Sequence, residues 1–286
     1  AASDVYKRQA KDFEKSRDFL ICIDSDGCAM DTMDVKHMRC FAPCLVHEWD
    51  LGDYREDIVR LWRKINLLSR SRGINRFKGL AKILVEINEN YARVDGLDEL
   101  IYWVQTTDEL SDESLREAYE RTDSICMKKA LEWPRLVNDS IVMLSNSRKS
   151  PFDGVEDALK LMKGKADVVI VTASNGKEIR REWEDSGLME YADLLLSQES
   201  GTKEACLQSL TERGYEKNHV LMIGDAPADK MAAESTGVLF YPVLAYQETE
   251  SWEEFAEKGL QHFLEGTFAG TYQEAKIKEF YANLDI

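Results

Sequence analysis

The sequence predicts an α/β protein with a parallel-sheet, Rossmann-like core that is interrupted by an inserted helical domain. Short apolar runs that end in Asp, Ser or Thr recur along the chain, and helical stretches separate most of them. Strands that alternate with helices of this size indicate a parallel sheet. The alternation stops once, after the first strand, where residues 32–147 show helical periodicity alone. Functional side chains are therefore expected at the carboxyl ends of the strands.

The expected strands are short and apolar, as is typical of strands buried on both faces. They are residues 19–24 before the insertion, then 167–172, 193–197, 220–225 and a weaker fifth at 238–241. The helices expected between them are residues 155–162, 177–186, 203–213 and 228–236. Glycines at 164, 187, 214 and 237 stand where these helices should end.

The inserted segment carries apolar residues at helical spacing, for example Ile58, Trp62 and Ile65, and later Leu80 and Leu84. It is expected to form a helical domain over residues 32–147, whose exit is the polar, turn-forming stretch 147–151. The core domain is then discontinuous and comprises residues 10–31 and 148–286. Residues 1–9 begin with Ala rather than Met and are left out of the fold prediction.

Composition excludes several classes of protein. The 286 residues contain 37 Lys and Arg against 53 Asp and Glu, and the net charge of −16 argues against general nucleic-acid binding. No apolar run approaches the roughly 18 residues of a membrane span. Six cysteines without a secretory signal predict reduced thiols and a cytoplasmic protein. No feature of the sequence points to a particular protein partner.

Two groups of carboxylates follow strands. Asp24 and Asp26 come at the end of the first strand, and a turn at Gly27 can bring both into one pocket, as a nucleophile with an acid/base or as a metal site. The plainer interpretation is an acidic turn. Asp225 and Asp229 follow the fourth strand, although Asp229 can equally stabilise the first turn of a helix. Four converging carboxylates need a cation, and oxygen ligands alone point to Mg²⁺.

Thr172 and Lys203 follow the second and third strands. The Thr172 hydroxyl, with the backbone N–H groups near Ser174 and Asn175, can hold an anion at a helix N-terminus. The alternative is that Ser174 or Asn175 only caps this helix. Lys203 opens the next helix, and a single lysine is usually solvated.

Taken in order, the D-x-D-G motif, the Thr, the Lys and the G-D-x-x-x-D motif resemble those of the haloacid dehalogenase-like (HAD) hydrolase superfamily. Residues 26–32, DGCAMDT, are similar to that family's usual DGT-L-hydrophobic-DS, with Cys28 for Thr and Ala29 for Leu. The resemblance covers about residues 17–31 and 150–245. The helical insertion stands where one class of these enzymes carries a mobile cap.

The resemblance implies a role for each motif residue. Asp24 is the nucleophile and Asp26 the general acid/base, and Thr172 and Lys203 hold the transferring phosphoryl group. The implied metal ligands are the carboxylates of Asp24, Asp225 and Asp229 and the backbone carbonyl of Asp26.

Asp26 is the acid that phosphatases and phosphomutases of the family have and its dehalogenases lack. We therefore expect a magnesium-dependent phosphatase that hydrolyses a small phosphorylated metabolite through an aspartyl-phosphate. One alternative is a phosphomutase of the β-phosphoglucomutase type that uses the same intermediate. Another is a non-catalytic binding or regulatory module on the same fold, against which the presence of both Asp24 and Asp26 argues.

A basic segment lies in the insertion. Residues 55–82 contain nine Lys and Arg and two acids, and Arg70, Arg72, Arg76 and Lys78 cluster around Gly73. Such a run is usually a solvated helix face. The functional alternative is a cap loop that binds an anionic part of the substrate, for which the forked guanidinium of Arg is suited.

Three remaining features have mainly structural explanations. His37, Cys40, Cys44 and His47 share one helical stripe, which is more often a packing face than a zinc site, and Pro43 can interrupt the helix. Cys28, beside the motif of the first strand, is expected to be a small buried filler. The acidic tail after residue 246 is expected to be helical.

Overall fold

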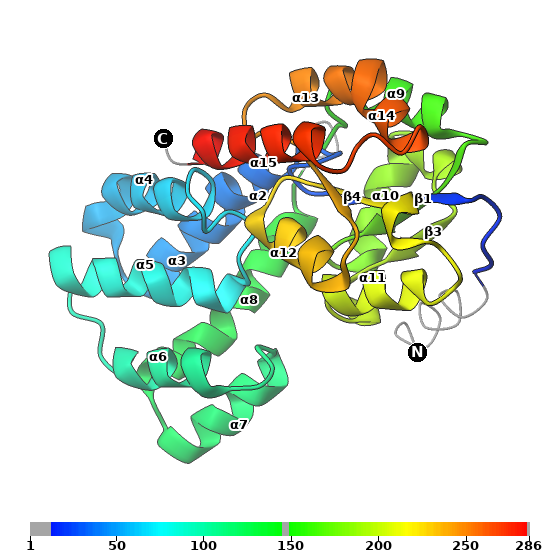
Figure 1. The fold of residues 1–286 in the computed structure, drawn as a ribbon. Helices are drawn as coiled ribbons and strands as arrows, with labels where there is room; N and C mark the ends of the chain where they lie inside the picture. Colours follow the sequence, from blue (N-terminus) through cyan, green and yellow to red (C-terminus); the bar gives the residue numbers. More distant parts are fainter. Residues whose placement is uncertain (1–12, 145–148, 285–286) are drawn as a thin grey trace. The chain divides into compact units, whose positions relative to one another are not determined.

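The computed structural model describes residues 13–144 and 149–284. The chain divides into two compact units, one made of Ala1–Met33 with Asn146–Ile286 and the other of Asp34–Ser145. The first is an α/β unit built on one sheet, and the second contains helices and connecting loops but no strand among its described residues (Figure 1). Each unit has its own hydrophobic core.

The α/β unit contains the parallel sheet that the sequence predicts. Its strand order is β3-β2-β1-β4-β5, and every neighbouring pair is parallel. The strands are β1 (Phe19–Ile23), β2 (Ala166–Val171), β3 (Leu194–Leu196), β4 (Val220–Gly224) and β5 (Leu239–Pro242). Because β1 lies in the middle, the residue that follows it sits between the ends of β2 and β4.

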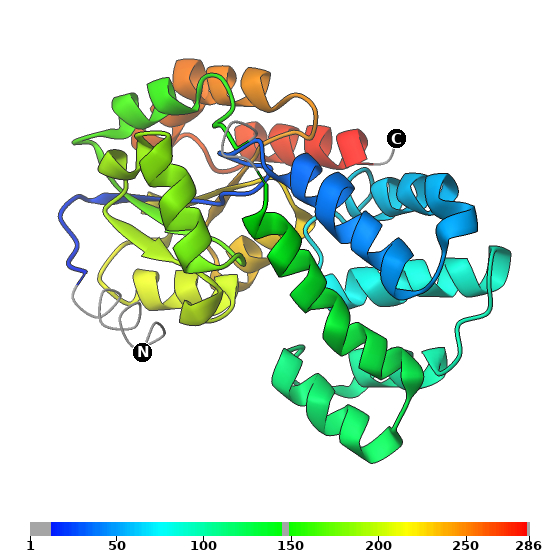
Figure 2. The ribbon, with the colours of Figure 1, turned by 180° about the vertical axis from the view of Figure 1, so that it is seen from behind.

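Helices cover both faces of this sheet (Figures 1 and 2). They are α9 (Val155–Met162), α10 (Gly176–Asp185), α11 (Lys203–Thr211), α12 (Pro227–Thr236), α13 (Glu248–Glu254), α14 (Leu260–Leu264) and α15 (Thr271–Leu284). A single π-helical turn at Phe255–Gly259 joins α13 to α14. The tail after residue 246 is therefore largely helical, as expected.

The two cores of this unit follow from the alternation of side chains along each strand. Ile21 and Ile23 point to the face covered by α9, α10, α13 and α14. Leu20 and Cys22, the intervening residues of β1, point to the face covered by α11, α12 and α15. Buried on both faces, the strands need to be apolar throughout, and this is why they appear in the sequence as continuous apolar runs.

The helical unit contains six helices of seven or more residues among its described residues. They are α3 (Ala42–Glu48), α4 (Arg55–Asn66), α5 (Arg76–Asn90), α6 (Leu97–Thr106), α7 (Asp112–Thr122) and α8 (Ile125–Val142). A short helix, α2 (Met33–Lys36), and a π-helical turn, His37–Phe41, precede α3. Pro43 lies in the first turn of α3, directly after the π-helical turn, and Lys36, Phe41 and Ala42 all have helical φ and ψ, so the chain stays helical there. No described helix is long and apolar enough to cross a membrane.

Candidate active site

The loop after β1 is held in one tight conformation. The N–H of Asp24 donates to the carbonyl of Ile223 at 3.0 Å, which continues the pairing of β1 with β4 by one residue. The carbonyl of Ser25 then accepts from the N–H groups of residues 28, 29 and 30 at 2.8–3.2 Å. Gly27 takes the positive φ of 77° that this turn requires and that a side chain would disfavour. The loop therefore fixes Asp24 at the end of the central strand.

Two indole groups brace the same loop from the α/β core. Nε1 of Trp183, on α10, donates to the Ser25 hydroxyl at 2.9 Å. Nε1 of Trp252, on α13, donates to the carbonyl of Cys28 at 2.8 Å. Cys28 itself is fully buried, and burial raises the pKa of its thiol well above the ordinary range, so it is the inert filler that the sequence predicts.

Three carboxylates meet beside this loop. One oxygen from each of Asp24, Asp225 and Asp229 lies within 4.8 Å of the other two, and all three side chains are buried. In the part of the chain that the structure describes, no other group of three His, Cys, Asp or Glu side chains comes this close. Asp24 follows β1 and Asp225 follows the adjacent strand β4, which is the juxtaposition expected at the carboxyl edge of a parallel sheet.

Asp229 both closes the first turn of a helix and belongs to the carboxylate cluster, the two roles that its position in the sequence suggested. Its Oδ2 accepts from the N–H of Ala226 at 3.0 Å and so closes the first turn of α12. Its Oδ1 is paired with Nζ of Lys203 at 2.5 Å. Gly224 makes this approach possible, because a Cβ at that position would lie 2.4 Å from Oδ2 of Asp229.

Lys203 lies between two of the carboxylates. Its Nζ is 2.7 Å from Oδ2 of Asp24 as well as 2.5 Å from Oδ1 of Asp229, and its side chain is 12 % exposed. Burial opposes its charge, but the two carboxylates outweigh burial and raise the pKa of the ammonium. Lys203 is thus a buried partner of the cluster and not the solvated lysine that its type would suggest.

The negative charge of the carboxylates is less well compensated than the positive charge of Lys203. Burial raises the pKa of Asp24 to about 6, Lys203 opposes this shift, and Asp229 adds to it. Burial likewise raises the pKa of Asp229, against Lys203 and with help from Asp225. Lys203 is paired with Asp24 and Asp229, and Asp225 adds a third carboxylate beside them, so negative charge exceeds positive charge within this group of four side chains. A hard cation with oxygen ligands, such as Mg²⁺, fits this donor set.

The side chain of Asp26 is not a member of the three-carboxylate cluster. It accepts hydrogen bonds from the hydroxyls of Thr32 and Ser174, the latter at 2.5 Å. The prediction of Asp26 as a metal ligand concerned its backbone carbonyl, which leaves the carboxylate available as an acid/base. Ser174 therefore contacts the expected acid/base, and Thr32 is a partner of Asp26 that sequence reasoning missed.

Thr172 follows β2 and is buried. Its N–H donates to the carbonyl of Leu196 at 2.9 Å, and its hydroxyl accepts from the N–H of Ser174 at 3.2 Å. Asn175 is the N-cap of α10, since its side-chain oxygen accepts from the N–H groups of Lys177 and Glu178 at 3.1 and 3.3 Å. The helix-cap interpretation of Asn175 is therefore the one that the structure shows.

Glu199, which sequence reasoning missed, occupies the remaining donors at this helix end. Its carboxylate accepts from the side-chain amide of Asn175 at 2.9 Å and from the N–H of Gly176 at 3.1 Å. It also accepts from the hydroxyl of Ser197 at 2.5 Å. The N–H groups of Gly176, Lys177 and Glu178 thus have acceptors within the protein, and an anion held by Thr172 with the N–H groups directly after it stays a prediction.

The predicted basic cluster lies in the helical unit, around the turn between α4 and α5. Arg70 and Lys78 are exposed, and Arg76 is half-buried with Nη1 3.5 Å from the Asn138 side-chain oxygen. Arg72 is only 2 % exposed, and its Nη1 donates to the carbonyl of Leu67 at 3.2 Å. The solvated-face interpretation is wrong for Arg72, because a guanidinium is needed inside this turn to bond a carbonyl left over at the end of α4.

The His and Cys stripe is a packing face, as the sequence favoured. Nδ1 of His37 accepts from Nε1 of Trp62 at 3.0 Å, and its ring stacks on Phe41 with centroids 4.6 Å apart. Sγ of Cys44 lies 3.4 Å from the Ser140 hydroxyl. No zinc-type group of ligands forms there among the described residues.

The fold resembles those of several solved structures. A "putative phosphoglycolate phosphatase" from Lactobacillus delbrueckii subsp. bulgaricus is 15 % identical, with a TM-score of 0.54 over 87 % of this chain and 98 % of that one. A haloacid dehalogenase-like family hydrolase from Streptococcus pneumoniae is 12 % identical, with a TM-score of 0.50 over 86 % and 98 %. A "putative beta-phosphoglucomutase" from Thermotoga maritima is 16 % identical, with a TM-score of 0.50 over 85 % and 99 %.

Sequence comparison gives the family. A search of curated proteins finds no significant match. The profile of the haloacid dehalogenase-like hydrolases, however, matches residues 74–243, which is more than half of the chain and includes Thr172, Lys203, Asp225 and Asp229. The chain belongs to the haloacid dehalogenase-like hydrolase family, as its motifs suggested.

Proposed function

We propose that this hydrolase is a magnesium-dependent phosphatase that removes phosphate from a small metabolite through an aspartyl-phosphate on Asp24. The observation that carries the proposal is the buried cluster of Asp24, Asp225 and Asp229, bridged by Lys203, at the carboxyl edge of the sheet. A buried excess of negative charge is costly to keep unless it serves chemistry.

Asp24 is the nucleophile of the proposal. One of its oxygens attacks phosphorus, the bond between phosphorus and the ester oxygen breaks, and an acyl phosphate forms. Its oxygens are held by the N–H of Ser25 at 2.8 Å and by Lys203 at 2.7 Å, which orients the carboxylate. The covalent intermediate divides one difficult hydrolysis into two easier steps.

Asp26 handles the proton in both steps. It protonates the departing alkoxide and then takes a proton from the water that attacks the acyl phosphate, so that Asp24 and inorganic phosphate are released. The hydroxyls of Thr32 and Ser174 fix the orientation of its carboxylate. A side chain that is not a member of the three-carboxylate cluster suits an acid/base that has to exchange protons.

Mg²⁺ would be held by the carboxylates of Asp24, Asp225 and Asp229 and, by the family resemblance, by the carbonyl of Asp26. When bound it supplies positive charge that stabilises the developing charge on the phosphoryl oxygens. Lys203 supplies a second positive charge, and the Thr172 hydroxyl supplies a hydrogen bond to the same group.

The helical unit is the cap of the proposal and selects the leaving group. Arg70, Arg76 and Lys78 would bind an anionic part of the substrate, and Arg72 would hold the turn that presents them. Closure of a cap excludes large phosphoproteins and bulk water, which favours a small cytoplasmic metabolite.

The test is a phosphate-release screen with the purified chain over sugar phosphates, phosphoglycolate, nucleotides and phosphonates. We expect turnover of at least one phosphate monoester with Mg²⁺, its loss after chelation, and its recovery when Mg²⁺ is restored. Asp225→Asn, which removes a proposed Mg²⁺ ligand, should lose this turnover. Asp18→Asn is its matched control, since it changes an exposed carboxylate before β1, and it should retain full activity.

Two results would contradict parts of this proposal. Full activity after exhaustive chelation would show that the reaction needs no metal ion. Release of phosphate from none of the panel would contradict the proposed phosphatase activity. A phosphoenzyme that outlives its first product and phosphorylates an added sugar phosphate would instead identify a phosphomutase.

A further inference from the structure

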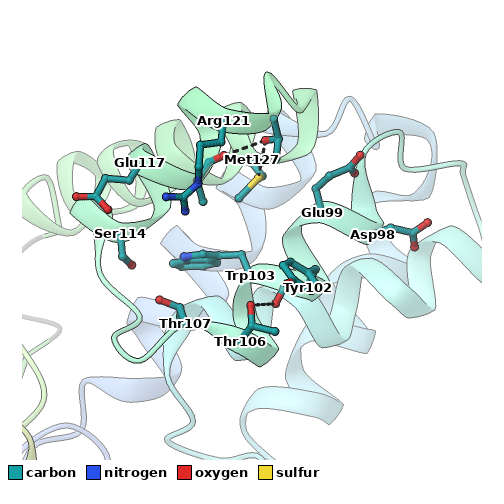
Figure 3. A pocket seen from close by; sticks show the side chains of 12 residues that line it. Asp98, Glu99, Tyr102, Trp103, Thr106, Thr107, Ser114, Glu117, Arg121 and Met127 are labelled. Atoms are coloured by element: carbon teal, nitrogen blue, oxygen red, sulfur yellow. Dashed lines mark hydrogen bonds between the residues drawn. The ribbon is translucent and has the colours of Figure 1, made fainter.

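A cavity of about 660 Å³ lies within the helical unit, between α6, α7 and the beginning of α8 (Figure 3). This volume is within the range of about 300–1,000 Å³ that is usual for small-molecule sites. Buried side chains of Trp103, Ala118 and Met127 form apolar parts of its wall. No residue of the proposed hydrolytic chemistry lines it, so the cavity needs an explanation of its own.

The indole of Trp103 has a hydrogen-bond donor with nothing to donate to. Trp103 is 4 % exposed, and its Nε1 is buried without an acceptor among the described residues. Four of the six indole nitrogens in the chain do have such an acceptor, namely those of Trp62, Trp133, Trp183 and Trp252. Trp49 shares the absence, but only the N–H of Trp103 belongs to a residue of the cavity wall.

Arg121 is a second donor on the same wall. It forms no ion pair or hydrogen bond with any described residue, although Glu117 lies one turn earlier on α7. Figure 3 shows Arg121 reaching from α7 toward the indole of Trp103, while Glu117 points away from it. A guanidinium next to an indole N–H is a suitable pair of donors for a carboxylate. The N–H of Trp103 is covered, so a ligand reaches it only if a neighbouring side chain moves. Arg121 is exposed and unpaired, so it can move toward the ligand without breaking a contact.

The other end of the cavity is acidic. Asp98 and Glu99, in the first turn of α6, lie on the opposite side of Trp103 from Arg121 (Figure 3). With Glu117 the lining has three carboxylates against one guanidinium. A simple anion is disfavoured by this charge balance, whereas a cationic group is favoured near the start of α6.

We propose that this cavity binds a small amphoteric molecule with a carboxylate at one end and an ammonium at the other, joined by an apolar stem. The carboxylate accepts from Arg121 and from Nε1 of Trp103. The stem packs along the indole and Met127, and the ammonium faces Asp98 and Glu99. Binding gives an acceptor to the N–H of Trp103, the one buried donor that is unpaired in this wall. Without a ligand, this unpaired donor lowers the stability of the helical unit.

The probe is 6-aminohexanoate, titrated into the full-length chain and followed by ¹H–¹⁵N NMR of the indole signals. Hexanoate and hexylamine each carry half of its charge pattern on the same stem. We expect 6-aminohexanoate to bind at least about tenfold more tightly than either half, since each end contributes charge-assisted hydrogen bonds. The Trp103 indole signal, identified by its absence from Trp103→Phe, should shift on saturation, and that of Trp133 should not.

Two variants and a control complete the test. Trp103→Phe keeps an aromatic ring and removes the N–H, and Arg121→Gln removes the guanidinium; each should weaken binding at least about tenfold. Arg116→Gln, on the same helix but outside the lining of this cavity, should bind as the parent chain does. Thermal unfolding of all three verifies that they remain folded.

Several outcomes would overturn the proposal. Equal affinity for hexanoate would mean a plain anion site, and equal affinity for hexylamine a plain cation site. No shift of the Trp103 signal at any probe concentration, or unchanged binding in both Trp103→Phe and Arg121→Gln, would mean that this cavity is not a site for such a ligand.

Discussion

At the scale of single residues, the balance of charge around Lys203 accounts for most of what the candidate active site can do. Its ammonium joins Asp24 to Asp229, whereas Asp225 is the third member of a cluster with excess negative charge. Asp229 therefore contributes to the fold as well as to the carboxylate cluster, because it also closes the first turn of α12.

Replacement of Asp225 and Asp229 should consequently have different effects. Asp225→Asn should weaken Mg²⁺ binding strongly and cost the metal-free protein less stability than Asp229→Asn does, because Asp225 repels Asp229 within the cluster. Asp229→Asn should destabilise the metal-free protein by about 3–5 kcal/mol, because it removes one partner of a buried ion pair. Thermal unfolding in chelator, with Mg²⁺ titration by calorimetry, separates the two effects. Equal stability losses would refute the distinction.

The close approach of Asp24, Asp225, Asp229 and Lys203 follows from rules that a sequence can express. Asp24 and Asp225 stand directly after a buried strand, and Asp229 and Lys203 open the helix that follows one, and parallel strands bring such residues to one edge. These rules do not predict the contacts of Glu199 and Thr32. Their partners lie in other parts of the chain or across a turn, and neither residue type announces a contact of this kind.

At the scale of secondary structure elements, Glu199 joins the end of β3 to the start of α10. It accepts from Asn175, Gly176 and Ser197, so the loop that carries Thr172 and Ser174 is tied to the loop that leads to Lys203. Glu199 is thus expected to position the two loops relative to each other without touching the substrate.

Glu199→Ala should lower the free energy of unfolding by about 1–3 kcal/mol, because the N–H of Gly176 and the amide of Asn175 lose their acceptor. It should also raise KM more than it lowers kcat, since the phosphoryl-binding loop loses its support. Glu204→Ala, the same change of residue type at an exposed position of α11, is the control. Steady-state kinetics and urea unfolding provide the measurements, and an unchanged KM would show that the contact is only structural.

The start of β1 is anchored to β2 and to Tyr215 through the carboxylate of Asp167. The backbone N–H groups of Ser16 and Arg17 donate to it at 2.9 Å. The hydroxyls of Ser16 and Tyr215 also donate to it. Burial alone would raise the pKa of Asp167, but these hydrogen bonds, led by that of Ser16, outweigh burial and lower it.

A carboxyl whose pKa is lower in the folded state stabilises the fold above its unfolded pKa and ceases to do so as the pH falls through the folded value. Asp167→Asn should therefore cost about 1.5–3 kcal/mol at pH 7. The difference from the parent chain should shrink below about pH 4, where the unfolded carboxyl becomes protonated. Urea unfolding of both proteins from pH 7 to pH 3 tests this, and a constant difference would exclude the linkage.

The positions of elements in the α/β unit were well predicted from sequence, because buried parallel strands form apolar runs and the helices between them end at glycines such as Gly237, whose φ is 75°. The helical unit was predicted only as helical. Its periodicity does not reveal which stripe packs against which, and Arg72 illustrates the consequence, since its burial depends on a turn that no local pattern specifies.

At the scale of the whole molecule, a net charge of −16 contrasts with the basic segment around Arg76 in the helical unit. An acidic protein that concentrates positive charge in one short segment, residues 55–82, is expected to use it on an anionic ligand. If the α/β unit binds a phosphoryl group as proposed, selection of the leaving group is expected to fall to the insertion.

Arg76→Ala should therefore cost about 1.5–3 kcal/mol in kcat/KM on substrates with a second anionic group. It should cost much less on substrates whose leaving group is neutral. Arg72→Ala is a useful comparison, because it removes the hydrogen bond to the Leu67 carbonyl. It should lower the free energy of unfolding and change kcat/KM equally for both substrate classes. Equal effects of Arg76→Ala on both substrate classes would mean that the cluster is only a solvated surface.

The central claim, covalent catalysis by Asp24, is tested most directly by trapping the phosphoenzyme. The chain is mixed with an accepted substrate and Mg²⁺, quenched in acid and treated with borohydride, which reduces an acyl phosphate to the alcohol. Mass spectrometry should then find the reduced residue at position 24 in the parent chain and in Asp26→Asn with a good leaving group, and nowhere in Asp24→Asn, which should not turn over. Near-normal turnover by pure Asp24→Asn, or a reduced residue elsewhere in the chain, would contradict the mechanism.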